Sequence, residues 1–160
     1  MTVYYFDTSA VVKRYVDEPG SAWVRGLCDQ LDPGTGEPIN LIAIGEITLV
    51  EVSAALAILV RRGILPKRFA ERAYRRFISD FQDEYDLARI TSASLLMAAS
   101  LAQRYPLKAY DAVQLSLAVH ANALLNADGL SLTLVSGDDQ LLQAAKAEGL
   151  MTDNPFEHAG

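Results

Sequence analysis

The stretch Thr2-Val3-Tyr4-Tyr5-Phe6-Asp7-Thr8-Ser9-Ala10 decides the fold predicted for this chain. Four consecutive β-branched or aromatic residues, Val3 to Phe6, predict a short strand that is buried on both faces. The apolar run ends at Asp7, and Thr8 and Ser9 then offer helix-capping hydroxyls before a helical pattern begins. The stretch thus predicts a carboxylate at the carboxyl end of a first, central strand, where open α/β sheets bind ligands. The alternative is that Asp7 only caps the helix.

Length and composition limit the possible classes of protein. The chain has 160 residues, 51% of them hydrophobic and 21% charged, which predicts one domain (1–160) with a real core rather than a disordered chain. No apolar run reaches the roughly 18 residues that span a bilayer, and no signal-peptide pattern opens the chain, so we expect no membrane association. The lone Cys28 cannot form an internal disulfide, which favours a cytoplasmic protein. One cysteine and two histidines cannot assemble an ordinary zinc site.

Apolar periodicity predicts strands that alternate with helices along the whole chain. Further strands are expected over 41–44, 87–90 and 132–135, with a short closing strand after Gly149. Helices are expected over 9–18, 21–31, 46–62, 66–84, 92–105 and 110–125, and a last one ends at 146. The segment 32–40 is dense in turn formers and predicts an exposed loop. This alternation predicts an α/β fold with a central parallel sheet that is covered on both faces.

Four of the twenty acidic residues stand in places that an ordinary surface does not explain. Glu51 shares its helix face with apolar residues only, and its alternative is a buried ion pair, for instance with Arg62. Asp111 opens a helix, where the helix dipole alone also favours an acid. Asp138 directly follows a strand, where capping is the alternative.

These acids are predicted to converge with Asp7. Asp7 and Asp138 both follow strands, and a doubly wound sheet brings such strand ends together. Glu51, in the second turn of the helix after another strand, and Asp111, which opens a helix, are expected to face the same crevice. Four carboxylates without cations would repel one another and hold protons at neutral pH. One or two Mg²⁺ or Mn²⁺ ions make the arrangement sensible, because these cations prefer oxygen ligands.

The segments around these acids resemble a known family. Residues 5–13 and 49–56 look like the opening of a PIN-domain ribonuclease, and more closely like the toxin of a VapBC toxin–antitoxin pair. Residues 110–115 and 136–141 resemble its two later motifs in the right order, and Gly149-Leu150 and Asn154-Pro155 also fit. The resemblance covers nearly the whole chain, although the extra length around 32–40 departs from a compact toxin.

The resemblance implies an α/β/α sandwich and a Mg²⁺- or Mn²⁺-dependent endoribonuclease that acts on RNA. It implies an antitoxin as partner, and we also expect a homodimer. The residues it assigns to catalysis and metal binding are Asp7, Glu51, Asp111 and Asp138. Ser9 and Ser136 match positions where a small hydroxyl residue supports the site, and Asp139 is placed with them.

Basic residues cluster where an RNA would need them. The formal net charge of −6 argues against general nucleic-acid binding, so a polyanionic substrate needs a local basic patch or bridging cations. Seven of the fourteen basic residues fall within 61–76, and one helix face carries Arg68, Arg72, Arg75 and Arg76. These arginines are candidates for phosphate contacts. The alternatives are a solvated face balanced by Glu71, or a docking surface for an acidic antitoxin segment.

Two other function classes compete with the nuclease. A phosphoacceptor signalling domain also places acids and Mg²⁺ at strand ends, but it needs a lysine after a late strand, and 135–138 contains none. A catalytically silent PIN-like interaction module is the other alternative, and the intact set of acids argues against it.

Overall fold

The structure, a computed structural model, describes residues 1–159 and contains a five-stranded parallel sheet. Its strands are β1 (Thr2–Phe6), β2 (Asn40–Gly45), β3 (Asp86–Ala88), β4 (Leu132–Val135) and β5 (Met151–Asp153). The strand order is β3-β2-β1-β4-β5, so the chain first builds outward from β1 on one side and then on the other. The crevice between the ends of β1 and β4 is therefore a topological switch point, the place where such sheets bind ligands.

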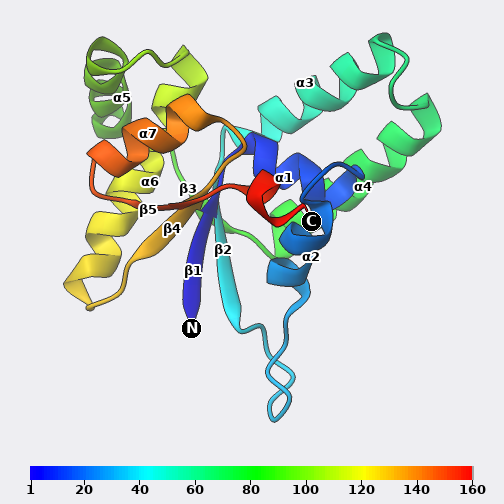
Figure 1. Ribbon diagram of the computed structural model, residues 1–160, viewed down its shortest axis with the longest axis horizontal. Helices are drawn as coiled ribbons and strands as arrows, with labels where there is room; N and C mark the ends of the chain where they lie inside the picture. Colours follow the sequence, from blue (N-terminus) through cyan, green and yellow to red (C-terminus); the bar gives the residue numbers. More distant parts are fainter. Residues whose placement is uncertain (160) are drawn as a thin grey trace.

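Helices cover both faces of the sheet (Figure 1). One face carries α1 (Thr8–Tyr15), α2 (Ser21–Asp29), α3 (Thr48–Arg61) and α4 (Lys67–Asp83). The other face carries α5 (Ser92–Arg104), α6 (Ala109–Ala127) and α7 (Asp139–Ala147). The predicted α/β/α sandwich with a parallel sheet is confirmed. No helix formed by residues 1–159 is long and apolar enough to cross a membrane.

Strand β1 contributes to both apolar cores, because successive side chains of a strand point to opposite faces. Val3 and Tyr5 pack with the α5–α7 layer, whereas Phe6 packs with the α1–α4 layer. Tyr5 and Phe6 are fully buried. This double burial explains the uninterrupted apolar run at the start of the sequence, and it fixes where Asp7 leaves the sheet.

Helix α3 differs from its prediction. Its sequence is apolar nearly all round and predicts packing on several sides. In the structure only Thr48, Val52 and Leu56 of this helix are buried, while 65% of Val50 and 39% of Ile58 stay exposed. The reason is that α3 and α4 pack on each other and extend away from the sheet as an arm (Figure 1), so half of the apolar surface of α3 has no covering element.

The C-terminal segment folds back onto α1 and α2 instead of forming a polar tail. After β5, a 3₁₀ helix, η1 (Pro155–His158), packs against α2. Buried Pro155 lies against the turn at Gly20, whose φ of 89° favours glycine. His158 stacks on Trp23 with ring centroids 4.0 Å apart and accepts or donates a 2.8 Å hydrogen bond with Asp153.

Two glycine substitutions around α2 test this packing. Gly20→Ala should destabilise the protein by about 2 kcal/mol or more, because the new Cβ would lie 2.5 Å from the Pro155 carbonyl oxygen and φ is left-handed. Gly26→Ala, inside α2 with no atom within 4 Å of its Cβ, should stabilise it by about 0.5–1 kcal/mol. Urea unfolding of both variants measures the difference, and equal stabilities would contradict the described contact.

Candidate active site

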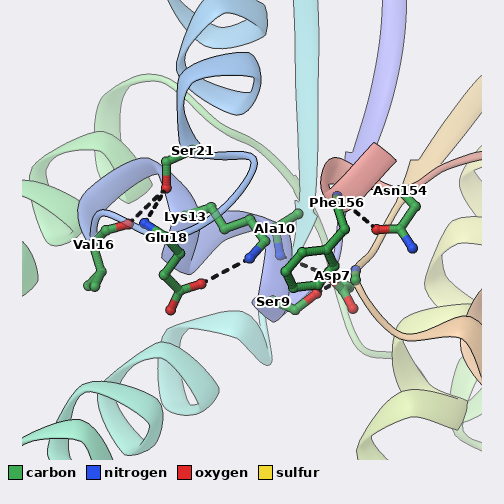
Figure 2. A network of polar contacts seen from close by, with 10 residues as sticks. Asp7, Ser9, Ala10, Lys13, Val16, Glu18, Ser21, Asn154 and Phe156 are labelled. Atoms are coloured by element: carbon green, nitrogen blue, oxygen red, sulfur yellow. Dashed lines mark hydrogen bonds and ion pairs between the residues drawn. The ribbon is translucent and has the colours of Figure 1, made fainter. Parts of the chain in front are cut away.

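Asp7 is the buried centre of the site. Only 5% of the residue is exposed, and it is the N-cap of α1 (Figure 2). Its Oδ1 accepts hydrogen bonds from the Ala10 N–H (3.0 Å) and the Ser9 hydroxyl (2.7 Å), and its Oδ2 accepts one from the Ser136 hydroxyl (2.6 Å). The capping role considered for Asp7 is therefore real, but two further hydroxyl donors and nearly complete burial exceed what a cap requires.

The two serine hydroxyls join the ends of β1 and β4. The Ser9 oxygen accepts a hydrogen bond from the Gly137 N–H (2.9 Å), and the Ser136 oxygen accepts one from the Asp138 N–H (3.0 Å). Each hydroxyl thus donates to Asp7 and accepts from the loop after β4. This arrangement accounts for hydroxyl residues at both positions, because a side chain without an O–H would leave an acceptor and a donor unpaired.

Burial raises the pKa of Asp7 from 3.8 to about 6. Loss of hydration is the largest cause, the three hydrogen bonds act in the opposite direction, and the negative charge of Asp111 adds a smaller increase. Asp7 therefore holds its proton to a higher pH than an exposed aspartate. A bound cation would have to displace that proton, so cation affinity should rise with pH.

Glu51 lies in the first turn of α3 and is held by a buried amide. The Gln114 Nε2 group donates to Glu51 Oε1 (2.8 Å) and to Thr48 Oγ1 (3.0 Å), and its Oε1 accepts from the Tyr5 hydroxyl (2.8 Å). Glu51 forms no ion pair with any side chain of residues 1–159. The expected alternative, a pair with Arg62, is therefore wrong, and a neutral donor leaves the negative charge of Glu51 uncompensated.

Gln114 and Tyr5 are site residues that the sequence motifs did not predict. Gln114 follows Asp111 by one helical turn on α6, and this spacing is the only local sign that both share a face. Its amide sits where Gly45 leaves room, because a Cβ at Gly45 would lie 2.7 Å from the Tyr5 hydroxyl and 3.2 Å from Gln114 Oε1. The network therefore ties the side chain of Glu51 to β1, the end of β2 and α6.

Asp111 and Asp138 complete the group of acids. Half-buried Asp111 opens α6, and its pKa is raised by burial first and then by the charges of Asp138 and Glu51, while Lys108 lowers it. Asp138 is the N-cap of α7 and accepts from the Gln140 and Leu141 N–H groups through Oδ1 alone. Because Asp111 also raises the pKa of Asp7, Asp111 interacts electrostatically with each of the other three acids.

The chemical type of the four side chains fits a hard divalent cation. All four supply carboxylate oxygens, and the exposed Lys108 is a cation that lowers the pKa of one of them, Asp111. No three His, Cys, Asp or Glu side chains among residues 1–159 form a closed metal-holding group as they stand. Burial is the main cause of the raised pKa values of Asp7 and Asp111, and a bound cation would relieve the smaller contribution that comes from repulsion between the acids.

Neither Asp139 nor the arginines of α4 form a hydrogen bond or ion pair with the four acids within residues 1–159. Exposed Asp139 accepts a 3.3 Å hydrogen bond from the Asn154 side chain, at the start of η1. The four arginines of α4 are all exposed and belong to the arm (Figure 1), and none forms an ion pair within residues 1–159. Glu71 pairs with Lys67 instead, at 3.9 Å, so it does not balance them. Arg68 and Arg72 both lie over the Phe69 ring, at 5.0 and 5.5 Å.

Comparison with known families assigns the chain. The family model described as PIN domain matches residues 4–147, a segment that includes all four acids. The chain belongs to the PIN domain family. Membership confirms the resemblance found in the sequence motifs. Comparison with curated protein sequences finds no match.

Several solved structures share this fold at low sequence identity. VapBC2 from Rickettsia felis, bound to a DNA fragment from its promoter, is 16% identical with a TM-score of 0.58, covering 96% of this chain and 98% of that chain. PAE2754 from Pyrobaculum aerophilum is 20% identical with a TM-score of 0.59, covering 98% and 85%. FitAcB from Neisseria gonorrhoeae is 16% identical with a TM-score of 0.56, covering 97% and 99%.

The raised pKa of Asp7 predicts an unusual pH dependence of stability. Between about pH 4 and pH 6 the folded protein binds more protons at this carboxyl than the unfolded chain does, so stability falls as the pH rises through this window. Without divalent cations, Asp7→Asn should match wild type near pH 4 and exceed its unfolding free energy by up to about 3 kcal/mol near pH 7. Urea unfolding in EDTA across this range measures the difference.

Asp32→Asn is the matched control for this measurement. Asp32 is fully exposed, and hydrogen bonds from the Thr35 and Gly34 N–H groups lower its pKa, so its contribution has the opposite sign and is lost as the pH falls. A difference between wild type and Asp7→Asn that does not change with pH would show that the carboxyl of Asp7 titrates normally.

Proposed function

We propose that this PIN domain is a metal-dependent endoribonuclease and the toxin of a toxin–antitoxin pair. The observation that supports this best is the buried, hydrogen-bonded Asp7 at the switch point of the sheet, whose pKa is raised further by Asp111, an acid that is itself acted on by Asp138 and Glu51. Gathering uncompensated carboxylates lowers the folding stability of a protein by roughly several kcal/mol, and such clusters are typical of functional sites. A silent interaction module would gain nothing from the arrangement.

We assign different roles to the four acids. Asp7, Glu51 and Asp111 would hold one or two Mg²⁺ or Mn²⁺ ions, and Asp138 would complete the pocket and orient the attacking water. When bound, the cation would supply Lewis-acid activation of the phosphodiester. Asp138 suits a water-directing role because Oδ1 satisfies the α7 N-terminus and leaves Oδ2 without a hydrogen bond among residues 1–159. Gln114 would orient Glu51, and Ser9 and Ser136 would orient Asp7.

RNA is the proposed substrate, and the arm is the proposed place of its phosphate contacts. Arg68, Arg72, Arg75 and Arg76 are exposed without carboxylate partners among residues 1–159, which leaves their charges available to a polyanion. A local patch of this kind offsets the net charge of −6. Asp139 has at most a supporting role, since its hydrogen bond is with Asn154.

The proposed partner is an antitoxin, and the proposed setting is the cytoplasm. VapBC, the pair to which the sequence motifs point, is also a solved structure with the same fold over nearly the full length of both chains. The uncovered apolar residues of the arm offer surface to such a partner. Exposed apolar side chains on α5, among them Leu95 and Leu96, support a homodimer.

The nuclease proposal predicts the effect of Glu51→Gln. This substitution preserves the shape of the side chain but removes the charge that would hold a cation, so cleavage of RNA in Mg²⁺ or Mn²⁺ should fall more than about tenfold, the usual scale for a perturbed metal site. Growth arrest on expression should disappear as well. Glu71→Gln, an exposed acid paired with Lys67, is the control and should cleave like wild type.

A cleavage assay with and without EDTA separates the alternatives. Wild-type protein that never cleaves RNA, with or without added cation, would support the silent module. Glu51→Gln that retains more than about a tenth of the wild-type rate would remove Glu51 from the proposed site.

A further inference from the structure

A cavity of about 460 Å³ borders the site at Asp138. Its lining also includes Thr8 and Ser9, and Ser9 is the residue whose hydroxyl donates to Asp7. Its floor is apolar and comes from Val12 on α1 and from Ala55, Ile58 and Leu59 on α3. A group attached to a phosphate at the acids would therefore reach this cavity without leaving the site.

Phe156 forms the wall of the cavity, and it is held rigidly. The Asn154 side chain accepts a hydrogen bond from the Phe156 N–H (3.0 Å), and the flanking Pro155 and His158 are packed on Gly20 and Trp23. The ring lies beside Asp7 and Ser9 (Figure 2), with its edge so close to Gly137 that a Cβ there would come within 2.8 Å. Half of the residue is nevertheless exposed.

A buried cation supports one side of this ring. The Lys13 ammonium lies 4.1 Å from the Phe156 ring centroid, only 2% of Lys13 is exposed, and its partner is Glu18 at 3.0 Å. The cation and the η1 contacts fix the ring at a defined angle, while the exposed part of the ring borders the cavity. A rigid aromatic face beside an apolar floor is the arrangement on which single-stranded nucleic-acid bases stack.

We propose that this cavity is a nucleobase subsite, in which a base next to the scissile phosphate of single-stranded RNA stacks on Phe156. The inference rests on the proposed nuclease function and adds to it a specificity-determining residue outside the acidic motifs. A planar base has apolar faces for the ring and the floor, and polar edges for the Thr8 and Ser9 hydroxyls and the Glu18 carboxylate at the rim. The volume is in the range of sites that enclose a small ligand.

The test compares binding of a short single-stranded RNA oligonucleotide of mixed sequence to Asp7→Asn proteins, which keep the fold and do not consume the probe. Phe156→Leu in this background should weaken binding about tenfold, because stacking on an aromatic side chain is lost while apolar volume remains. Phe156→Trp should bind within about twofold of the parent. Tyr74→Leu, which removes an aromatic of 38% exposure on α4, should change nothing.

Oligonucleotides that lack one base at a time locate the stacked nucleotide. At one position next to the cleavage site, removing the base should weaken binding to the Asp7→Asn parent about tenfold. The same removal should not weaken binding further when the protein also carries Phe156→Leu. In the wild-type enzyme Phe156→Leu should raise KM and leave kcat within about twofold. Non-additive effects of base removal and Phe156→Leu on binding are an outcome that a merely structural Phe156 would not produce.

Each failure has a distinct meaning. The subsite would be overturned if RNA bound Phe156→Leu as tightly as the parent, or if the effect of every base removal simply added to the effect of Phe156→Leu. Cleavage of RNA by wild type would still support the nuclease function in that case. Phe156-dependent binding without cleavage by any wild-type preparation would overturn the nuclease function and retain the subsite. A Phe156→Leu protein that binds RNA normally but loses an antitoxin peptide would assign the cavity to the protein partner and also overturn the subsite.

Discussion

The hydrogen bonds from Ser9 and Ser136 to the buried Asp7 carboxylate are the interactions on which the site depends. The Ser136 hydrogen bond (2.6 Å) crosses the gap between β1 and β4, while Ser9 donates to Asp7 from α1 (2.7 Å) and accepts from the Gly137 N–H beyond β4 (2.9 Å). Together they fix both strand ends around one charge. If Asp7 were buried without these donors, its carboxyl would stay protonated or water would have to enter the crevice, because a desolvated carboxylate requires hydrogen-bond donors. With them the pKa stops at about 6, low enough for the carboxyl to ionise and bind a cation at neutral pH.

A second layer of neutral groups places the other acids. Gln114 holds Glu51 by a donor that carries no charge, so Glu51 is oriented without being neutralised. Asp138 is oriented by helix N–H groups, and Asp111 by its place in the first turn of α6. Backbone dipoles and an amide thus position negative charge that no basic side chain cancels, apart from the exposed Lys108. This accumulated repulsion is a cost in the free protein and a source of affinity for a divalent cation.

Much of this arrangement could be predicted from the sequence, and the reasons are local. Four apolar residues before Asp7 mark a doubly buried strand, and parallel strands bring Asp7 and Asp138 to one edge whatever the details of packing. Gln114 could not be predicted, because its role depends on which face of α6 meets β1 and on the space left by Gly45. The exposed apolar face of α3 and the packing of Phe156 at the site likewise depend on tertiary structure. Periodicity predicts which residues form an apolar face, but it does not predict which element packs against that face.

The central claim is that the four acids form one cation site, and Mn²⁺-dependent melting tests it most directly. If the site is formed, a Mn²⁺ concentration about 100 times Kd should raise the melting temperature of wild type by roughly 5–10 °C relative to EDTA, because the cation binds only the folded protein. Asp7→Asn keeps the helix cap and the fold, and its melting temperature should respond to Mn²⁺ little or not at all. Wild type and Asp7→Asn that respond equally to Mn²⁺, or that both fail to respond, would contradict the account.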